Sequence, residues 1–118
     1  MFRRMLRAIL LSCVILTCAM PVQASGFVSG ALLLQMCTEN GGLKNPTCEA
    51  YLAGAQDLLI LFQQSSAVRT GVCLPSDATG LTNGAIILEY LGAHQSDLAS
   101  NSGAALAWVA LFQKYPCG

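Results

Sequence analysis

Apolar residues recur at helical spacing in four segments of the chain, with turn-forming residues between them. The first segment covers about residues 27–38. The second opens at Asn45, a favoured helix N-cap, has Pro46 at its first helical position, and fades in the polar run 63–66. These signals predict two helices joined by a short turn.

The second half of the chain carries two further helical segments. The third is expected to start at Thr79 as N-cap, although the dipeptide Asn83-Gly84 inside it by itself favours a turn. A polar stretch over residues 94–102 follows, and Pro116 ends the fourth segment. Because no segment alternates like a strand, we expect an all-α fold, a small four-helix bundle held by two disulfides.

The residues expected to face the core share steps of three or four positions. They are Phe27, Ala31, Leu34 and Cys37 in the first segment, Leu52, Ala55, Leu59 and Phe62 in the second, Leu81, Ala85, Leu88 and Leu91 in the third, and Ala104, Trp108, Leu111 and Tyr115 in the fourth. Phe112 is also interpreted as a core residue, not as part of a ligand site.

The first 24 residues differ in composition from the rest of the chain. Three arginines precede an uncharged apolar run over residues 8–19, and small or apolar residues surround a cleavage position after Ala24. The run is shorter than the roughly 20 residues that cross a bilayer. We therefore expect residues 1–24 to be a signal peptide and residues 25–118 to form one exported domain.

Removal of the signal peptide changes the charge of the chain. All six acidic residues lie after residue 24, but only three strong bases do (Lys44, Arg69 and Lys114), so the net charge falls from 0 to −3. No basic cluster remains to neutralise phosphates or anionic lipids. Binding to nucleic acid or to a membrane surface is therefore disfavoured.

Four cysteines lie after residue 24: Cys37, Cys48, Cys73 and Cys117. An even number in an exported domain indicates two disulfides, and four cysteines allow three pairings. We favour Cys37–Cys48, which flanks a short loop rich in turn residues, and Cys73–Cys117, which joins the chain end to the middle of the domain. With no Cys-x-x-Cys spacing and a single histidine, a zinc site or redox pair is the weaker interpretation, and no cofactor is expected.

Catalytic motifs are scarce in this chain. His94, Ser96 and Asp97 are close in sequence, but a catalytic triad requires convergence in space beside an oxyanion hole. The sequence contains no Gly-x-Ser-x-Gly, His-Glu-x-x-His, P-loop or dinucleotide-binding motif. The residues alone indicate an exported helical binding or structural module and not an enzyme.

The arrangement of residues 30–117 resembles the Rap/Tai immunity proteins of type VI secretion systems. The cysteine spacing carries part of the similarity. Residues 48–57 add a Tyr-x-x-Gly-x-x-Asp step, residues 71–75 read Gly-Val-Cys-Leu-Pro, and residues 115–117 close the chain with Tyr-Pro-Cys. The resemblance implies a periplasmic, mostly helical protein, often a homodimer, that binds a secreted peptidoglycan amidase and covers its active-site groove.

The resemblance concerns the scaffold and assigns no inhibitory residue. Our own hypothesis places the partner-binding surface at His94, Gln95, Ser96 and Asp97, because this connection is polar and lies between two rigid helices. Family members have a Pro soon after this His, whereas Gln95 follows it here.

Two other functions fit the same chain: an acid-stress periplasmic chaperone, and a structural paralogue without a toxin partner. Such a chaperone unfolds at about pH 2–3 as its carboxylates become protonated, and two disulfides oppose that unfolding. The sequence alone does not separate the toxin inhibitor from the paralogue without a partner.

Overall fold

The structure, a computed structural model, describes residues 28–66 and 68–118. The predicted signal peptide and Phe27 lie outside the described residues. In chain order the helices are α2 (Gly30–Thr38), the 3₁₀ helix η1 (Gly42–Lys44), α3 (Pro46–Ser65), α4 (Gly80–Ala93), the 3₁₀ helix η2 (Gln95–Asp97) and α5 (Gly103–Lys114). The predicted all-α fold with four helices and two disulfides is confirmed.

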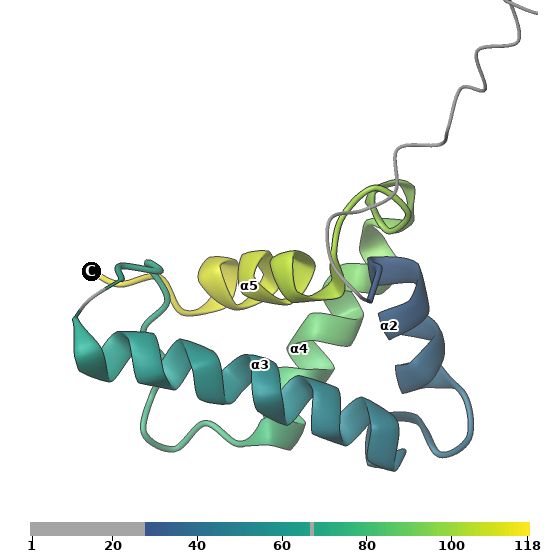
Figure 1. Ribbon diagram of the computed structural model, residues 1–118, viewed down its shortest axis with the longest axis horizontal. Helices are drawn as coiled ribbons and strands as arrows, with labels where there is room; N and C mark the ends of the chain where they lie inside the picture. Colours follow the sequence, from purple (N-terminus) through teal and green to yellow (C-terminus); the bar gives the residue numbers. More distant parts are fainter. Residues whose placement is uncertain (1–27, 67) are drawn as a thin grey trace, which may run out of the picture.

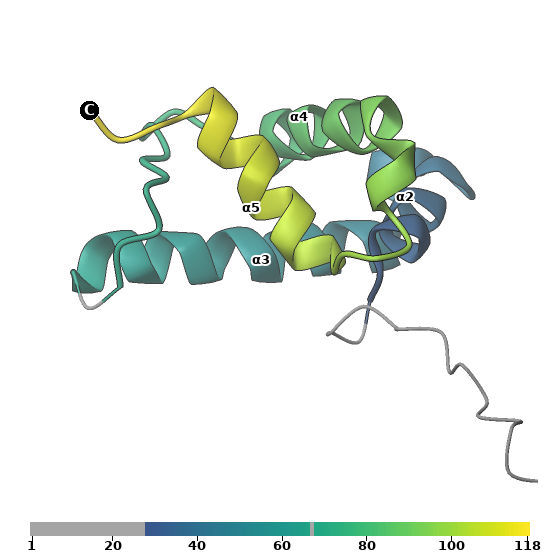
Figure 2. The same ribbon diagram turned by 90° about the horizontal axis from the view of Figure 1, so that it is seen from above.

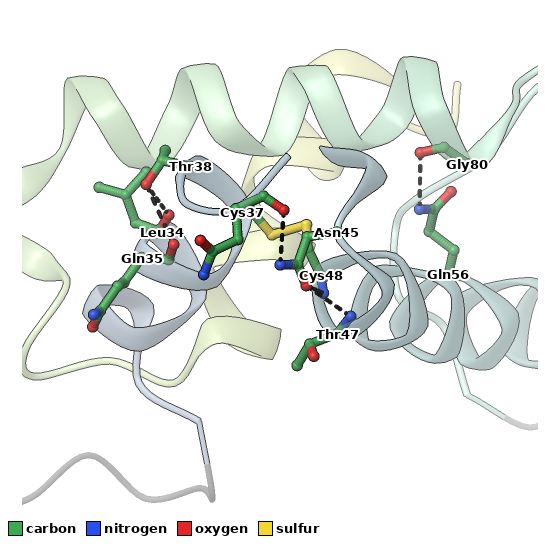
Figure 3. The surroundings of a disulfide bond; sticks show 10 residues. Leu34, Gln35, Cys37, Thr38, Asn45, Thr47, Cys48, Gln56 and Gly80 are labelled. Atoms are coloured by element: carbon green, nitrogen blue, oxygen red, sulfur yellow. Dashed lines mark hydrogen bonds between the residues drawn. A yellow bond between two sulfur atoms is a disulfide. The ribbon is translucent and has the colours of Figure 1, made fainter. Parts of the chain in front are cut away.

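The two helices of the first half, α2 and α3, each begin at a residue whose side chain caps the helix N-terminus. At α2, Leu32 N donates to Ser29 Oγ (3.2 Å). At α3, Thr47 N donates to Asn45 Oδ1 (2.9 Å, Figure 3), and Pro46 occupies the first helical position. These bonds satisfy amides that have no partner inside a helix, so the prediction of Asn45 as N-cap is confirmed.

Helix α4 also begins where the sequence predicts. Thr82 N donates to Thr79 Oγ1 and Thr79 N donates to Thr82 Oγ1, both at 3.1 Å, which forms a capping box. Asn83 and Gly84, which as a dipeptide favour a turn, lie inside the helix and are buried. A Cβ at position 84 would lie 3.0 Å from Leu43 Cδ2, so the glycine lets η1 approach the helix closely.

The four helices enclose one core. Figure 1 shows α2 at one end of the molecule and the C-terminus at the other, and Figure 2 shows α5 crossing obliquely above α3 beside α4. Helix α2 contacts α3, α4 and α5, and α4 packs against both α3 and α5. None of the described helices is both long and apolar enough to cross a membrane.

Two disulfides tie this arrangement together, and they are the pairs that the cysteine spacing favours. Cys37–Cys48 joins α2 to the first turn of α3 (Figure 3), and Cys73–Cys117 joins the segment before α4 to the chain end. Their surroundings differ. Cys37 and Cys48 are 1% and 0% exposed within the core, whereas Cys73 and Cys117 are exposed at the surface.

The predicted core-facing stripe holds best for α3, where Leu52 and Leu59 are buried and Ala55 and Phe62 are half-buried. In α2 the buried residues are Gly30, Leu33 and Cys37; Leu34 is half-buried and Ala31 is exposed. The predicted α2 stripe is therefore shifted by one residue, apart from Cys37.

The predicted stripes of α4 and α5 are wrong at several positions. In α4, Leu81 and Ala85 are exposed, and the buried face includes Ile87 and Leu91 together with Asn83. In α5 the buried residues are Gly103, Leu106, Ala107, Ala110 and Leu111, so only Leu111 of the predicted set is fully buried. Ala104, Trp108 and Phe112 are exposed instead, and Tyr115 is half-buried. Both helices are so rich in Ala, Gly and Leu that more than one face has helical spacing.

Candidate functional site

The connection between α4 and α5 contains the four residues that the sequence nominates for partner binding. In Figure 1 it rises above the bundle next to α2. His94 is the C-cap of α4, and Gln95–Asp97 form η2. Gln95 and Ser96 are exposed, while His94 and Asp97 are half-buried. The four residues thus form one continuous and partly accessible turn.

The ring of His94 is fixed by its own helix. Its Nδ1 lies 2.8 Å from the carbonyl oxygen of Tyr90, and its ring stacks on that of Tyr90 with a centroid distance of 3.9 Å and an interplanar angle of 18°. A carbonyl oxygen only accepts hydrogen bonds, so Nδ1 carries the hydrogen, and in the neutral ring Nε2 is left as an acceptor. The connection therefore holds one side chain with a defined orientation and a defined acceptor atom.

Backbone and side-chain bonds inside the turn limit its freedom. Asp97 N donates to His94 O (3.0 Å), and Asp97 O accepts from Asn101 Nδ2 (3.0 Å). Leu98 follows, is 4% exposed and belongs to the hydrophobic core. A buried leucine directly after an exposed turn anchors that turn to the bundle.

The start of α2 holds the same connection from the other side. Ala31 N donates to Leu98 O (3.1 Å) and Gly30 N donates to Asn101 O (3.0 Å). These bonds give partners to amides at the helix start that the helix itself leaves unpaired. A Cβ at position 30 would meet Leu106 Cδ1 and would lie 3.1 Å from Leu98 Cα, so the close approach depends on glycine.

A groove between α4 and α5 continues from His94 along the surface. Side chains of both signs line it, with Glu89 on α4 and Lys114 on α5, beside Tyr90 and Gln113. Ala110, which is 3% exposed, also lines it. The groove adds polar and apolar contact area to the connection, which suits recognition of a protein surface.

The residues of this turn do not form a catalytic triad. Ser96 Oγ donates to Asp97 Oδ1 (3.4 Å) rather than to the imidazole, and the Nδ1 hydrogen of His94 is used by Tyr90 O rather than by a carboxylate. In a triad the imidazole bonds both the serine and the acid. Within residues 28–66 and 68–118, no group of three His, Cys, Asp or Glu residues is placed to hold a metal ion.

A buried amide pair between α3 and α4 was not predicted from the sequence. Asn83 Nδ2 donates to Gln56 Oε1 (2.9 Å), and Gln56 Nε2 donates to Gly80 O (3.5 Å, Figure 3). Gln56 and Asn83 are only 5% and 2% exposed. Gln56 lies one turn after Leu52 and three residues before Leu59, and this register was the available signal for its burial.

Comparison with known families identifies the scaffold. The family model of Rap1a immunity proteins matches residues 29–117. The chain belongs to the Rap1a immunity protein family. This confirms the resemblance seen in the cysteine spacing and the Tyr-Pro-Cys ending. No significant match was found among the curated proteins or among the solved structures.

Membership of an immunity family implies a toxin as partner, and such families are typically non-enzymatic. The matched region contains helices α2, α3, α4 and α5 of the described residues and the disulfides Cys37–Cys48 and Cys73–Cys117. It also contains the connection from His94 to Asp97, so the nominated surface is part of the family domain.

Proposed function

We propose that this Rap1a family protein acts in the periplasm, where it binds a peptidoglycan amidase delivered by a type VI secretion system and covers its active-site groove. The family match over residues 29–117 carries this proposal. Inhibition of this kind needs no chemistry by the inhibitor, because a rigid protrusion that fills the groove excludes the substrate.

The geometry of the α4–α5 connection supports its assignment as the contact surface. The turn is exposed at Gln95 and Ser96, yet it is anchored by Leu98 and bonded to the start of α2. A loop that is ordered before binding loses little conformational entropy in the complex, which favours affinity. His94, stacked on Tyr90, adds an oriented polar group to that surface.

The direct test begins with the gene beside this one: where it encodes a small secreted peptidoglycan amidase, that enzyme is the partner to use. The purified processed protein is mixed with the enzyme, and hydrolysis of peptidoglycan is followed by turbidity. We expect inhibition to be complete near equal stoichiometry and the two proteins to elute together from a sizing column. Full amidase activity with no joint elution would show that the proposed function is wrong.

A matched pair of variants locates the contact surface. Ser96 is exposed in the connection after α4, and Ser76 is exposed in the loop before α4, at the opposite end of that helix. Ser96→Arg places a long charged side chain in the proposed contact and is expected to weaken inhibition by about tenfold or more. Ser76→Arg is the control and should inhibit like the unaltered protein. If Ser96→Arg inhibits normally and Ser76→Arg does not, the contact lies at the other end of the molecule.

The proposal includes a homodimer. Large apolar side chains are exposed on two helices, with Leu58 and Leu61 on α3 (50% and 55%) and Trp108 and Phe112 on α5 (39% and 42%). Exposed apolar surface of this kind is typical of association sites. Sedimentation velocity over a range of protein concentrations should show a dimer, and a single monomeric species at the highest concentration would contradict it.

A further inference from the structure

The two disulfides differ in their access to solvent and in what surrounds them. Cys37 and Cys48 are 1% and 0% exposed and belong to the core, so a reagent reaches their sulfurs only after α2 separates from α3. Cys73 and Cys117 are both exposed. Thiol–disulfide exchange requires a thiolate to approach a sulfur directly, so access controls its rate.

A surface groove runs past the exposed disulfide. Cys73 and Cys117 line it together with Arg69 and the apolar residues Phe62 and Val68. Arg69 is exposed, and a neighbouring positive charge stabilises both an incoming thiolate and the thiolate that leaves. Phe62 and Val68 offer apolar contact to a protein that carries such a thiolate.

We propose that Cys73–Cys117 is a site of thiol–disulfide exchange for a protein dithiol reductant of the Cys-x-x-Cys kind, docked in the groove of Phe62, Val68 and Arg69, while Cys37–Cys48 stays oxidised. A thiolate of the reductant attacks one sulfur and forms a mixed disulfide, and the other cysteine leaves as a thiolate that takes up a proton. The second thiol of the reductant then attacks the mixed disulfide and frees the remaining cysteine. Two electrons and two protons pass to Cys73 and Cys117, and the reductant becomes a disulfide.

Opening this bond releases a small clamp at the end of the bundle. Beside the disulfide, Cys73 N donates to Tyr115 O and Cys117 N donates to Gly71 O, both at 2.9 Å, around the bridge between Val72 and Pro116. Once the covalent link is lost, the segment is held by these two backbone bonds, by the side chain of Val72, which is 2% exposed in the core, and by the bonds between Gln63 and the backbone of Leu74. The free energy needed to open it locally is therefore lower than in the oxidised protein.

Trp108 reports on that clamp. Its indole Nε1 donates to Thr70 O at 2.9 Å, and it is the single tryptophan of the chain. The side chain is already 39% exposed, and movement of residues 70–73 away from α5 breaks this bond and exposes the indole further. Reduction of Cys73–Cys117 should therefore change Trp108 fluorescence with the same time course as the appearance of the two thiols.

The first experiment measures selectivity on the oxidised protein. It is incubated with thioredoxin, kept reduced by its reductase and NADPH, and free thiols are trapped by alkylation and assigned by peptide mass, which also separates Cys13 and Cys18. We expect Cys73 and Cys117 to be alkylated about tenfold faster than Cys37 and Cys48, or more. Loss of both disulfides at one rate, or of Cys37–Cys48 first, would overturn the proposal, as would a Trp108 signal that follows only Cys37–Cys48.

The second experiment tests the groove. Arg69→Glu reverses the charge beside the disulfide, and Lys44→Glu reverses another exposed charge, on η1, as the matched control. Arg69→Glu should slow reduction by thioredoxin about threefold to tenfold, and Lys44→Glu should leave the rate unchanged. Equal rates for the two variants would remove Arg69 from the site. Equal rates per thiol for thioredoxin and dithiothreitol on the unaltered protein would show that small thiols suffice and that no protein docks.

Discussion

At the residue scale, the buried amides Gln56 and Asn83 carry much of the specificity of the α3–α4 contact. The carbonyl of Gly80 only accepts, so it fixes Nε2 of Gln56 towards itself and leaves Oε1 for Asn83 Nδ2. Both hydrogen bonds form in only one orientation of the pair, which favours one register of the two helices over neighbouring ones, while Asn83 Oδ1 is left without a partner in the described part of the chain.

Removal of Gln56 leaves the Asn83 amide buried without that partner. Gln56→Ala is therefore expected to lower the free energy of unfolding by about 1–3 kcal/mol. Gln64→Ala is the matched control, because it makes the same substitution at an exposed position of the same helix and so cancels the change in helix propensity. Urea unfolding followed by circular dichroism measures both. A loss in Gln56→Ala no larger than that in Gln64→Ala would contradict the role of the pair.

Tyr51 gives a pH-dependent prediction. Burial raises the pKa of its phenol, and a hydrogen bond with the backbone of Ala104 opposes that rise in part. As the pH passes about 10, Tyr51 ionises in the unfolded chain before it ionises in the folded one, so the unfolded state binds fewer protons and stability falls. The contribution is fully present below about pH 10 and is lost as the pH rises through the folded pKa.

Tyr51→Phe removes this component of the alkaline transition. Its free energy of unfolding should decrease less steeply above about pH 10 than that of the unaltered protein, whereas at pH 7 it should be lower by about 0.5–1.5 kcal/mol for the lost hydrogen bond. Parallel stability curves for the two proteins across the alkaline range would show that Tyr51 does not contribute.

At the element scale, the junction between α2 and the α4–α5 connection depends on Gly30. A side chain at position 30 would meet Leu106 and the backbone of Leu98. Leu98 directly follows the proposed contact surface, residues 94–97. Gly30→Ala should therefore destabilise the protein by about 1–3 kcal/mol through overpacking.

Gly54 supplies the control for that variant. It lies exposed in the middle of α3, and a Cβ there has nothing within 4 Å, so Gly54→Ala should stabilise the protein by about 0.5–1 kcal/mol. Thermal unfolding of both variants shows directly whether each substitution stabilises or destabilises the protein. A Gly30→Ala protein that is as stable as the unaltered one would mean that α2 and the connection can move apart without loss.

The starts of α3 and α4 and the buried face of α3 were predictable from the sequence, whereas the buried faces of α2, α4 and α5 were not. A cap is a local signal, since Asn45 and Thr79 bond amides two or three residues away. A buried face depends on distant neighbours. In α5, Ala104, Trp108 and Leu111 have helical spacing and were predicted to face the core. The more closely packed face is instead that of Leu106, Ala107 and Ala110, because small residues there let the helix approach the core.

Trp108 is one residue whose location depends on a distant segment and could not be predicted from local sequence. Its size favours a core location, but the structure places it over the segment before α4, where its indole N–H bonds the Thr70 carbonyl. That segment lies 38 residues away in sequence, so no local pattern could reveal the contact. The position of the turn after α4 was easier to predict, because its polarity between two apolar helices is visible in the sequence alone, and its role as the contact surface stays a prediction.

At the scale of the whole molecule, a domain of this size has little margin without its disulfides. The chain-entropy model assigns about 3 kcal/mol to the loop closed by Cys37–Cys48 and about 4 kcal/mol to the longer loop closed by Cys73–Cys117. Their sum is comparable to the whole net stability of an ordinary domain, about 5–15 kcal/mol.

Loss of Cys73–Cys117 alone and loss of both disulfides should therefore have different effects on stability. The Cys73→Ser/Cys117→Ser protein should stay folded, with a lower urea midpoint, because both positions are exposed and the core disulfide remains. The protein with all four cysteines replaced should lose its cooperative urea transition and most of its amidase inhibition, because separation of α2 from the bundle breaks the bonds from Gly30 and Ala31 that help to hold the α4–α5 connection. A quadruple variant with an unchanged midpoint would show that helix packing alone maintains the fold, and the inhibitory surface would then not depend on the disulfides.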